Sequence, residues 1–234
     1  MGNTILVGST KGGVGKSMIA TNLAAYHQSQ LENKDILLID TDIQGSTADW
    51  CYFRTGTGKE DIECIQLFGK KIITEIQSKK ERYNDIIIDA GGTDSTELRS
   101  AMVIADKMIT PIRASQFDVS TLETLDSLLE EVKATVNPDL QCFAVVNGLK
   151  NHPNIPEFGQ AMEAVREFDN IEPIDFPIHD RIIYSRTGRE GLGVHEMDNP
   201  NPKATTEIQK IHSILYEQET IQEKYEKSEE GRSG

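Results

Sequence analysis

The chain has 234 residues, a hydrophobic content of 37% and a net charge of −14 at pH 7. This length and apolar content allow a sizeable buried core, while the acidic balance excludes a surface broadly attracted to nucleic acid or anionic lipid, although not a local basic patch. No apolar run approaches the roughly 18 residues of a membrane-spanning helix and no basic leader precedes the first apolar run, so we expect a cytoplasmic protein.

Short apolar runs alternate with helical patterns along most of the chain. We predict strands at residues 4–7, 36–39, 64–67, 86–88, 107–111 and 142–146, and helices at 18–30, 72–81, 95–105, 119–135 and 204–227. The runs at 36–39 and 86–88 do not alternate with polar residues, as expected of central strands covered on both faces. The sequence therefore predicts a doubly wound α/β fold, with a mostly parallel sheet, helices on both faces and nucleotide at the carboxyl ends of the strands.

The end of the chain is acidic. After Leu215 it carries six glutamates against three basic residues. A helix that docks on anionic lipid is instead rich in Lys and Arg opposite an apolar face, so we do not expect membrane binding. We predict a single domain over residues 1–227 and a disordered polar tail over 228–234.

The first predicted strand runs into a glycine-rich turn, KGGVGKS at residues 11–17. A strand, a glycine-rich loop and a helix in this order are typical of a phosphate-binding loop, in which backbone N–H groups and the helix dipole face an anion. Lys16 would neutralise the outer phosphates and Ser17 would ligate Mg²⁺. The predicted nucleotide-binding residues of this loop are Gly12, Gly13, Val14, Gly15, Lys16, Ser17 and Met18.

A second lysine distinguishes this loop from the ordinary one. Thr10 stands where the pattern G-x-x-x-x-G-K-[ST] has its first glycine, so the variant K-G-G-x-G-K-[ST] fits instead. An ammonium group at Lys11 is explained if it reaches phosphate charge across a face-to-face dimer, as an arginine finger does in trans. The alternative is a solvated surface lysine beside the loop.

Aspartates end two of the predicted buried strands. Asp40 and Asp42 follow residues 36–39, and Asp89 follows residues 86–88. A carboxylate at the tip of a buried strand is stabilised by coordinating Mg²⁺ directly or through water, so the three are candidates for the metal and the attacking water. Each could instead cap a helix or shape a turn.

Three segments together resemble the ParA/MinD family of deviant-Walker P-loop ATPases. KGGVGKS at 11–17, DTDIQGS at 40–46 and DIIIDAGG at 85–92 match its Walker A, Walker A′ and Walker B segments. The resemblance is greatest to short ParA-type plasmid partition proteins that lack an N-terminal helix-turn-helix. It implies that Lys11, Lys16 and Asp42 are catalytic, with Asp42 acting on the hydrolytic water, and that Ser17, Asp40 and Asp89 surround Mg²⁺.

Later segments carry the same resemblance. Asn147 is similar to the family's adenine-contacting asparagine, and Pro177 and Ile178 to the segment that lines the base. Asn147 could equally be a strand-end turn residue. Thr110-Pro111 and the segment 116–118 are similar to the family's switch-side region. Many relatives carry proline or another small residue at the position of Gly92. The glycine widens the conformational range of the loop near the γ-phosphate.

The resemblance implies a cytoplasmic ATPase switch. ATP would close a homodimer that binds nonspecific DNA, is associated with the nucleoid and positions a DNA cargo in plasmid partition. A small ParB-type centromere-binding adaptor would stimulate hydrolysis. The candidate DNA contacts are Arg181, Arg186, Arg189 and Lys203, followed by Lys210, although these could be solvent-exposed or intramolecular charges.

The sequence leaves several alternative functions to consider. The cargo could be a carboxysome, a conjugation complex or a chromosome, and a MinD-like membrane role is disfavoured by the acidic tail. A nitrogenase-type iron protein would need cysteines that hold a cluster, but Cys51, Cys64 and Cys142 are scattered and are interpreted as reduced thiols. A dethiobiotin-synthetase-like ligase would lack Lys11 in its proposed role.

Overall fold

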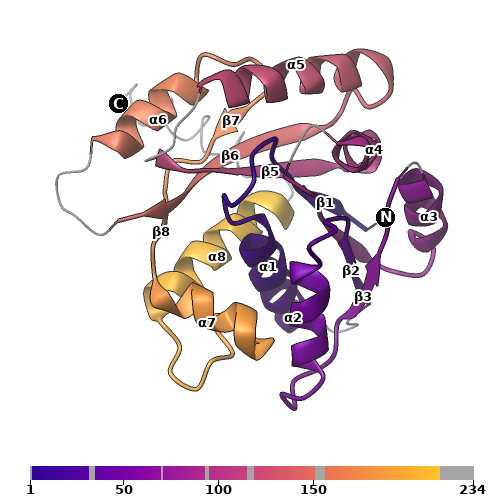
Figure 1. Cartoon of the computed structure of the whole chain (residues 1–234), viewed down its shortest axis with the longest axis vertical. Helices are drawn as coiled ribbons and strands as arrows, with labels where there is room; N and C mark the ends of the chain where they lie inside the picture. Colours follow the sequence, from indigo (N-terminus) through magenta and orange to yellow (C-terminus); the bar gives the residue numbers. More distant parts are fainter. Residues whose placement is uncertain are drawn as a thin grey trace, which may run out of the picture.

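Eight parallel strands form the centre of the molecule in a computed structural model, which describes residues 2–31, 35–69, 71–92, 95–114, 119–150 and 156–216 (Figure 1). The sheet order is β3-β2-β4-β1-β5-β6-β7, with β8 beside β6. The strands are β1 (Thr4–Val7), β2 (Ile36–Asp40), β3 (Glu63–Gln66), β4 (Asp85–Asp89), β5 (Lys107–Ile112), β6 (Gln141–Leu149), β7 (Glu172–Pro173) and β8 (Ile178–His179).

The strand β1 lies between two strands that are distant in sequence. It pairs with β4, where Thr4 faces Ile86, and with β5, where Ile5 faces Lys107. Every residue of β1, β2 and β4 is buried, which explains why these runs are apolar without alternation.

Helices cover both faces of the sheet (Figure 1). One face carries α1 (Lys16–Gln30), α2 (Ser46–Arg54), α7 (Ile182–Glu190) and α8 (Pro202–Tyr216). The other carries α3 (Lys71–Lys79), α4 (Thr96–Ile104), α5 (Val119–Thr135) and α6 (Glu157–Val165). The predicted doubly wound α/β fold is therefore confirmed.

The sequence did not predict α2, α6, α7, β7 or β8. The start of α2 explains why this helix was not predicted. Its N-cap is a glycine without a capping side chain. Its first N–H groups instead bond to the carboxylate of Asp40, in the preceding strand. Of the predicted helix 204–227, α8 accounts for the part up to Tyr216. The remainder, the tail 228–234 and the segment 116–118 lie outside the described residues, and no helix within the described ranges combines the length and apolar character needed to cross a membrane.

A buried ion pair fixes the far end of α2. Arg54 is 1% exposed and forms a two-pronged contact with Glu196, at 2.8 Å from Nη1 and 2.9 Å from Nη2. Its remaining N–H groups donate to the carbonyl oxygens of Glu60 and Gly191 and to the Gln28 side chain. This guanidinium therefore joins α2 to α1 and to the segment that follows α7.

Candidate nucleotide-binding site

The glycine-rich loop connects β1 to α1 and leaves the start of the helix open. Gly13 and Gly15 have φ values of 71° and 100°, a left-handed conformation that strongly favours glycine. Among the described residues no side chain caps α1 at Gly15, and its first turn contains no acidic residue. The first N–H groups of α1 and the positive end of its dipole therefore have no competing side-chain anion among the described residues of that turn, as an anion site requires.

Asn147 holds this loop from β6. Its side-chain Nδ2 donates to the Val14 carbonyl oxygen at 2.7 Å, and a Cβ at Gly15 would collide with the same amide group. Asn147 is 4% exposed and pairs in register with Ile178 of β8, whose own side chain is fully buried. The structure thus gives Asn147 a role in shaping the loop, while its contact with adenine stays a prediction. Ile178 is fully buried, and its place beside a base likewise stays a prediction.

The two lysines of the loop lie close together. The Lys16 ammonium is buried and donates to the Lys11 carbonyl oxygen at 3.2 Å. Burial lowers the pKa of Lys16, and the charges of Asp89 and Asp42 oppose that shift. Lys11 is half-buried, and its backbone N–H donates to the Ser9 hydroxyl at 3.2 Å. The charge of Lys16 is therefore influenced both by Asp42, the predicted catalytic carboxylate, and by Asp89, a predicted Mg²⁺ ligand.

Asp40 and Asp89 lie side by side at the carboxyl ends of β2 and β4. Asp40 is fully buried and accepts hydrogen bonds from the N–H groups of Asp42, Thr47 and Ala48. Burial raises the pKa of Asp40 although these donors oppose the shift. Its carboxylate thus has the capping role that the sequence left open, and its place at Mg²⁺ rests on the resemblance.

Thr47 is a site residue that the sequence analysis missed. Its N–H donates to Asp40 Oδ2 at 3.1 Å and its hydroxyl donates to Asp89 Oδ2 at 2.7 Å. It joins the two carboxylates because α2 begins where β2 and β4 end. The one feature of the sequence that could have indicated this role is the position of Thr47 directly after the segment 40–46.

Asp89 fits the predicted Mg²⁺ site. Its Oδ1 is buried and has no hydrogen-bond partner in the described part of the chain. Burial raises the pKa of Asp89 to about 7, although hydrogen bonds from Thr47 and Ser17 oppose the shift. A divalent cation at the unpartnered oxygen would stabilise the charged carboxylate, and the Ser17 hydroxyl, which hydrogen-bonds to Asp89, would offer a further oxygen ligand.

Asp89 also makes the stability of the metal-free chain depend on pH. Its pKa rises from 3.8 in the unfolded chain to about 7 in the folded one, so the folded chain holds the proton more tightly between these values. The resulting stabilisation is complete below the lower pKa. It is lost as the pH rises through the upper pKa, with a slope of at most about 1.4 kcal/mol per pH unit.

Asp89→Asn removes this titration while keeping the shape of the side chain. We expect the variant to gain stability relative to wild type as the pH rises from about 5 to about 8, because only the wild-type carboxyl loses stabilisation in that range. Urea denaturation with EDTA present at both pH values measures the difference. An unchanged difference in the free energy of unfolding would contradict the assigned shift.

Asp42 lies at the mouth of the site. Its Oδ1 accepts from the Gln44 N–H at 2.9 Å, and its carboxylate lines a cleft of about 620 Å³ that Lys16 and Gly12 also line. Gly92 closes over the loop, since a Cβ there would lie 2.7 Å from the Gly12 Cα and 3.0 Å from the Lys16 Nζ. The cleft therefore brings a cation, a carboxylate and a glycine-lined wall together.

The chain matches the family of CobQ/CobB/MinD/ParA nucleotide-binding domains over residues 5–194. It belongs to this family. The matched region contains the loop at 11–17 and all three aspartates, so the nucleotide-binding architecture inferred from geometry is that of the CobQ/CobB/MinD/ParA domain.

Individual relatives are similar at low sequence identity. The chromosome-partitioning ATPase Soj of Thermus thermophilus is 27% identical over 169 residues, 61% of this chain and 67% of that protein. The maintenance of carboxysome distribution protein A of Halothiobacillus neapolitanus is 22% identical over 211 residues, 89% of this chain and 94% of that protein. A plasmid partition protein from Borrelia burgdorferi, solved with AMPPNP, superposes with a TM-score of 0.66 at 19% identity, covering 90% of this chain and 98% of that one.

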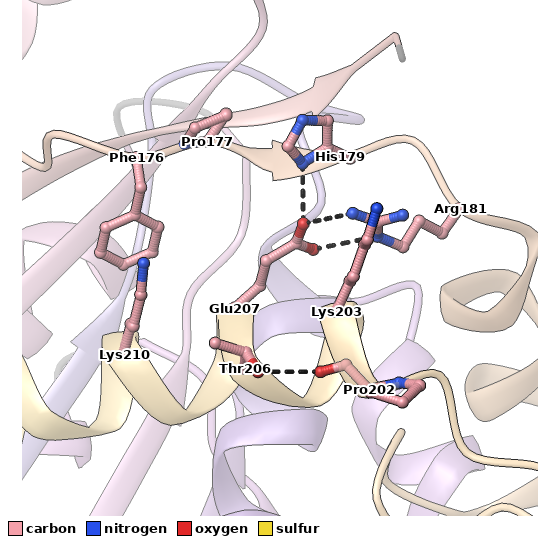
Figure 2. A pocket seen from close by; sticks show the side chains of 9 residues that line it. All are labelled: Phe176, Pro177, His179, Arg181, Pro202, Lys203, Thr206, Glu207 and Lys210. Carbon is pink, nitrogen blue, oxygen red and sulfur yellow. Dashed lines mark hydrogen bonds and ion pairs between the residues drawn. The ribbon is translucent and has the colours of Figure 1, made fainter.

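The candidate DNA contacts do not all line one pocket. Arg181 and Lys203 line a pocket between β8 and the start of α8, whereas Arg186 and Arg189 are exposed along α7 and do not line it (Figure 2). Arg181 is bonded to Glu207, so the intramolecular alternative holds for this residue in the structure. Pro177 lines the same pocket and not the cleft at the loop. The other predicted loop residue, Met18, is half-buried beside Ser17.

Proposed function

We propose that this chain is a magnesium-dependent ATPase switch that forms a homodimer on ATP binding and positions a DNA cargo, with plasmid partition as the first candidate. One observation carries the proposal: within the described residues, Lys16 and Asp42 line the same cleft at an uncapped helix start, and the charge of Asp89 acts on Lys16 there. A triphosphate and a metal supply the charges that this arrangement would neutralise.

The proposed reaction converts ATP and water to ADP and phosphate. Bound Mg²⁺, held by Ser17 and Asp89, would offset the charge of the phosphates. Asp42 would orient the attacking water, and Lys16 would stabilise the negative charge on the transferred phosphoryl group. The pKa of Lys16 is lowered by burial, but Asp89 and Asp42 oppose the shift and support the charged form.

The rim of the cleft supports the proposed dimer. Ile43 and Phe68 line the cleft and are 84% and 48% exposed. A second copy placed face to face over the cleft would cover both apolar side chains and exclude water from the phosphates. In that arrangement Lys11 would act on the partner's nucleotide.

Nonspecific DNA binding would then be a property of the ATP dimer. The net charge of −14 requires a local contact surface, and the pocket lined by Arg181, Lys203 and Lys210 supplies cations for it. Dimerisation would double this surface. A small ParB-type centromere-binding adaptor would stimulate hydrolysis, so the chain would be cytoplasmic and associated with the nucleoid only in its ATP state.

The cargo has more than one candidate. Soj is a chromosome-partitioning protein and the Halothiobacillus relative maintains carboxysome distribution, which favours positioning of a chromosome or a carboxysome as the second proposal. Membrane positioning of the MinD type is disfavoured by the acidic composition after Leu215.

Fluorescence anisotropy with a labelled random-sequence duplex tests the DNA part of this proposal. We expect the chain to bind at least tenfold tighter with magnesium and a nonhydrolysable ATP analogue than with ADP, a typical allosteric ratio being about 5- to 150-fold. Binding should weaken steeply with salt, and Lys203→Ala should reduce the slope of log affinity against log salt by about one per lost phosphate contact.

Lys71→Ala is the matched control, because Lys71 is an exposed lysine in the first turn of α3 on the opposite face of the sheet. It should bind DNA like the wild type. Equal binding with ATP analogue and ADP, or equal effects of the two substitutions, would overturn the DNA-binding role.

A further inference from the structure

The pocket beside α8 gathers positive charge around a single carboxylate (Figure 2). Lys203, Glu207 and Lys210 lie on one face of α8, spaced four and then three residues apart. Lys203 and Lys210 are exposed, and the Lys210 ammonium lies 5.1 Å from the centre of the Phe176 ring. The pocket is therefore suited to a phosphate-bearing polyanion.

Glu207 occupies the centre of this pocket and joins three segments. Its Oε1 accepts from Arg181 Nη2 at 2.8 Å and contacts His179 Nδ1 at 2.7 Å. Its Oε2 accepts from the Tyr184 hydroxyl at 2.8 Å. Burial raises the pKa of Glu207, but these three partners lower it below its ordinary value, so the carboxylate stays charged and offsets Arg181.

A continuous set of contacts links this carboxylate to the phosphate-binding loop. Asn147 bonds to the Val14 carbonyl oxygen of the loop and pairs in register with Ile178. The next residue, His179, bonds to Glu207, which holds Arg181. Asn147 and Glu207 are themselves buried, so a displacement of the loop reaches Arg181 through packed groups and not through solvent.

We propose that His179 and Glu207 couple nucleotide occupancy of the loop to the availability of Arg181 for DNA phosphates. Without nucleotide, Glu207 holds Arg181 as an internal ion pair. Nucleotide at the loop shifts β8 through Asn147, the His179 contact pulls on Glu207, and Arg181 becomes able to exchange its carboxylate partner for a phosphate. This coupling rests on the proposed DNA-binding function and assigns its regulation.

Two substitutions at His179 test the coupling. His179→Phe keeps a ring but removes the bond to Glu207, so we expect the ratio of DNA affinities with ATP analogue and ADP to fall from tenfold or more to about one. His179→Gln restores a side-chain donor and should recover most of the ratio. By reciprocity, DNA should tighten binding of the analogue by the same factor in the wild type and not in His179→Phe.

Tyr184→Phe is the matched control, since it removes a hydrogen bond of similar length to the same carboxylate but lies outside the linking contacts. The ratio of its DNA affinities with ATP analogue and with ADP should remain that of the wild type. If Tyr184→Phe lowers the ratio as much as His179→Phe, or if His179→Phe keeps the full ratio, the coupling is wrong.

A second measurement needs no DNA. The ¹⁵N–¹H signal of the Arg181 Nε group, assigned with Arg181→Lys, reports its contact with Glu207 directly. We expect magnesium and the ATP analogue to shift this signal in the wild type and in His179→Gln, but not in His179→Phe. A wild-type signal that does not respond, or a response that survives in His179→Phe, overturns the coupling. A normal response in a chain that binds no DNA would keep the coupling and reject the proposed DNA partner.

Discussion

Asp42→Ala is expected to reduce the rate of ATP hydrolysis by about two to four orders of magnitude, the usual contribution of a group that positions or deprotonates the attacking water. The carboxylate is held at the cleft by bonds from Gln44 to its side chain and from its own N–H to Asp40. Because Asp42 forms no part of the glycine-rich loop, nucleotide binding should persist. Phosphate release under single-turnover conditions measures the loss.

The same variant should accumulate as a dimer with magnesium-ATP, since hydrolysis no longer reopens it. Lys11→Ala in the Asp42→Ala background should prevent that dimer if Lys11 acts across the interface, and light scattering distinguishes the two states. Asp139→Ala, an exposed aspartate near the start of β6, is the control for a lost carboxylate. A solitary Asp42→Ala chain in magnesium-ATP would contradict the proposed switch.

Arg54→Ala is expected to cost about 3–5 kcal/mol of folding free energy, because it leaves Glu196 partly buried and without its cation. Arg54 also packs over the Trp50 ring at 5.1 Å and donates to two backbone carbonyl oxygens, so the truncation removes packing as well as charge. Urea denaturation followed by circular dichroism measures the change in the free energy of unfolding.

Two further variants test whether the stabilisation comes from the burial of the Arg54–Glu196 pair or is common to exposed ion pairs. Arg54→Met with Glu196→Gln removes both charges and should recover part of the lost stability. Arg166→Ala breaks an ion pair of 3.0 Å whose side chains are 54% and 79% exposed, and should cost no more than about 1 kcal/mol. Equal losses for Arg54→Ala and Arg166→Ala would show that the buried pair contributes little.

The parts of this molecule that could be predicted are those whose residues lie close together in the sequence. The loop at 11–17 contains its glycines, two lysines and serine within seven residues, and the aspartates directly follow apolar strands. The central strands were recognisable because residues covered on both faces are uniformly apolar. These features describe the nucleotide site and the sheet without any knowledge of long-range contacts.

The parts that were missed depend on register and on distant partners. Thr47 joins Asp40 and Asp89 only because β2 and β4 are neighbours in the sheet. Glu207 meets His179 across 28 positions, and Arg54 meets Glu196 across 142. No pattern in a single sequence reports such pairs. For Asp40 the sequence allowed two roles, and the contacts with backbone N–H groups established the capping one.

The placement of β1 at the centre of the sheet sets the order in which this chain can mature on the ribosome. Its partners in β4 and β5 include Ile86 and Lys107, so β1 must wait for about a hundred further residues before both of its edges are paired. At translation rates of about 5–20 residues per second, that wait lasts roughly 5–20 s. The nascent apolar segment is exposed throughout this interval, which makes early synthesis the stage at which chaperone capture or misassociation competes with folding.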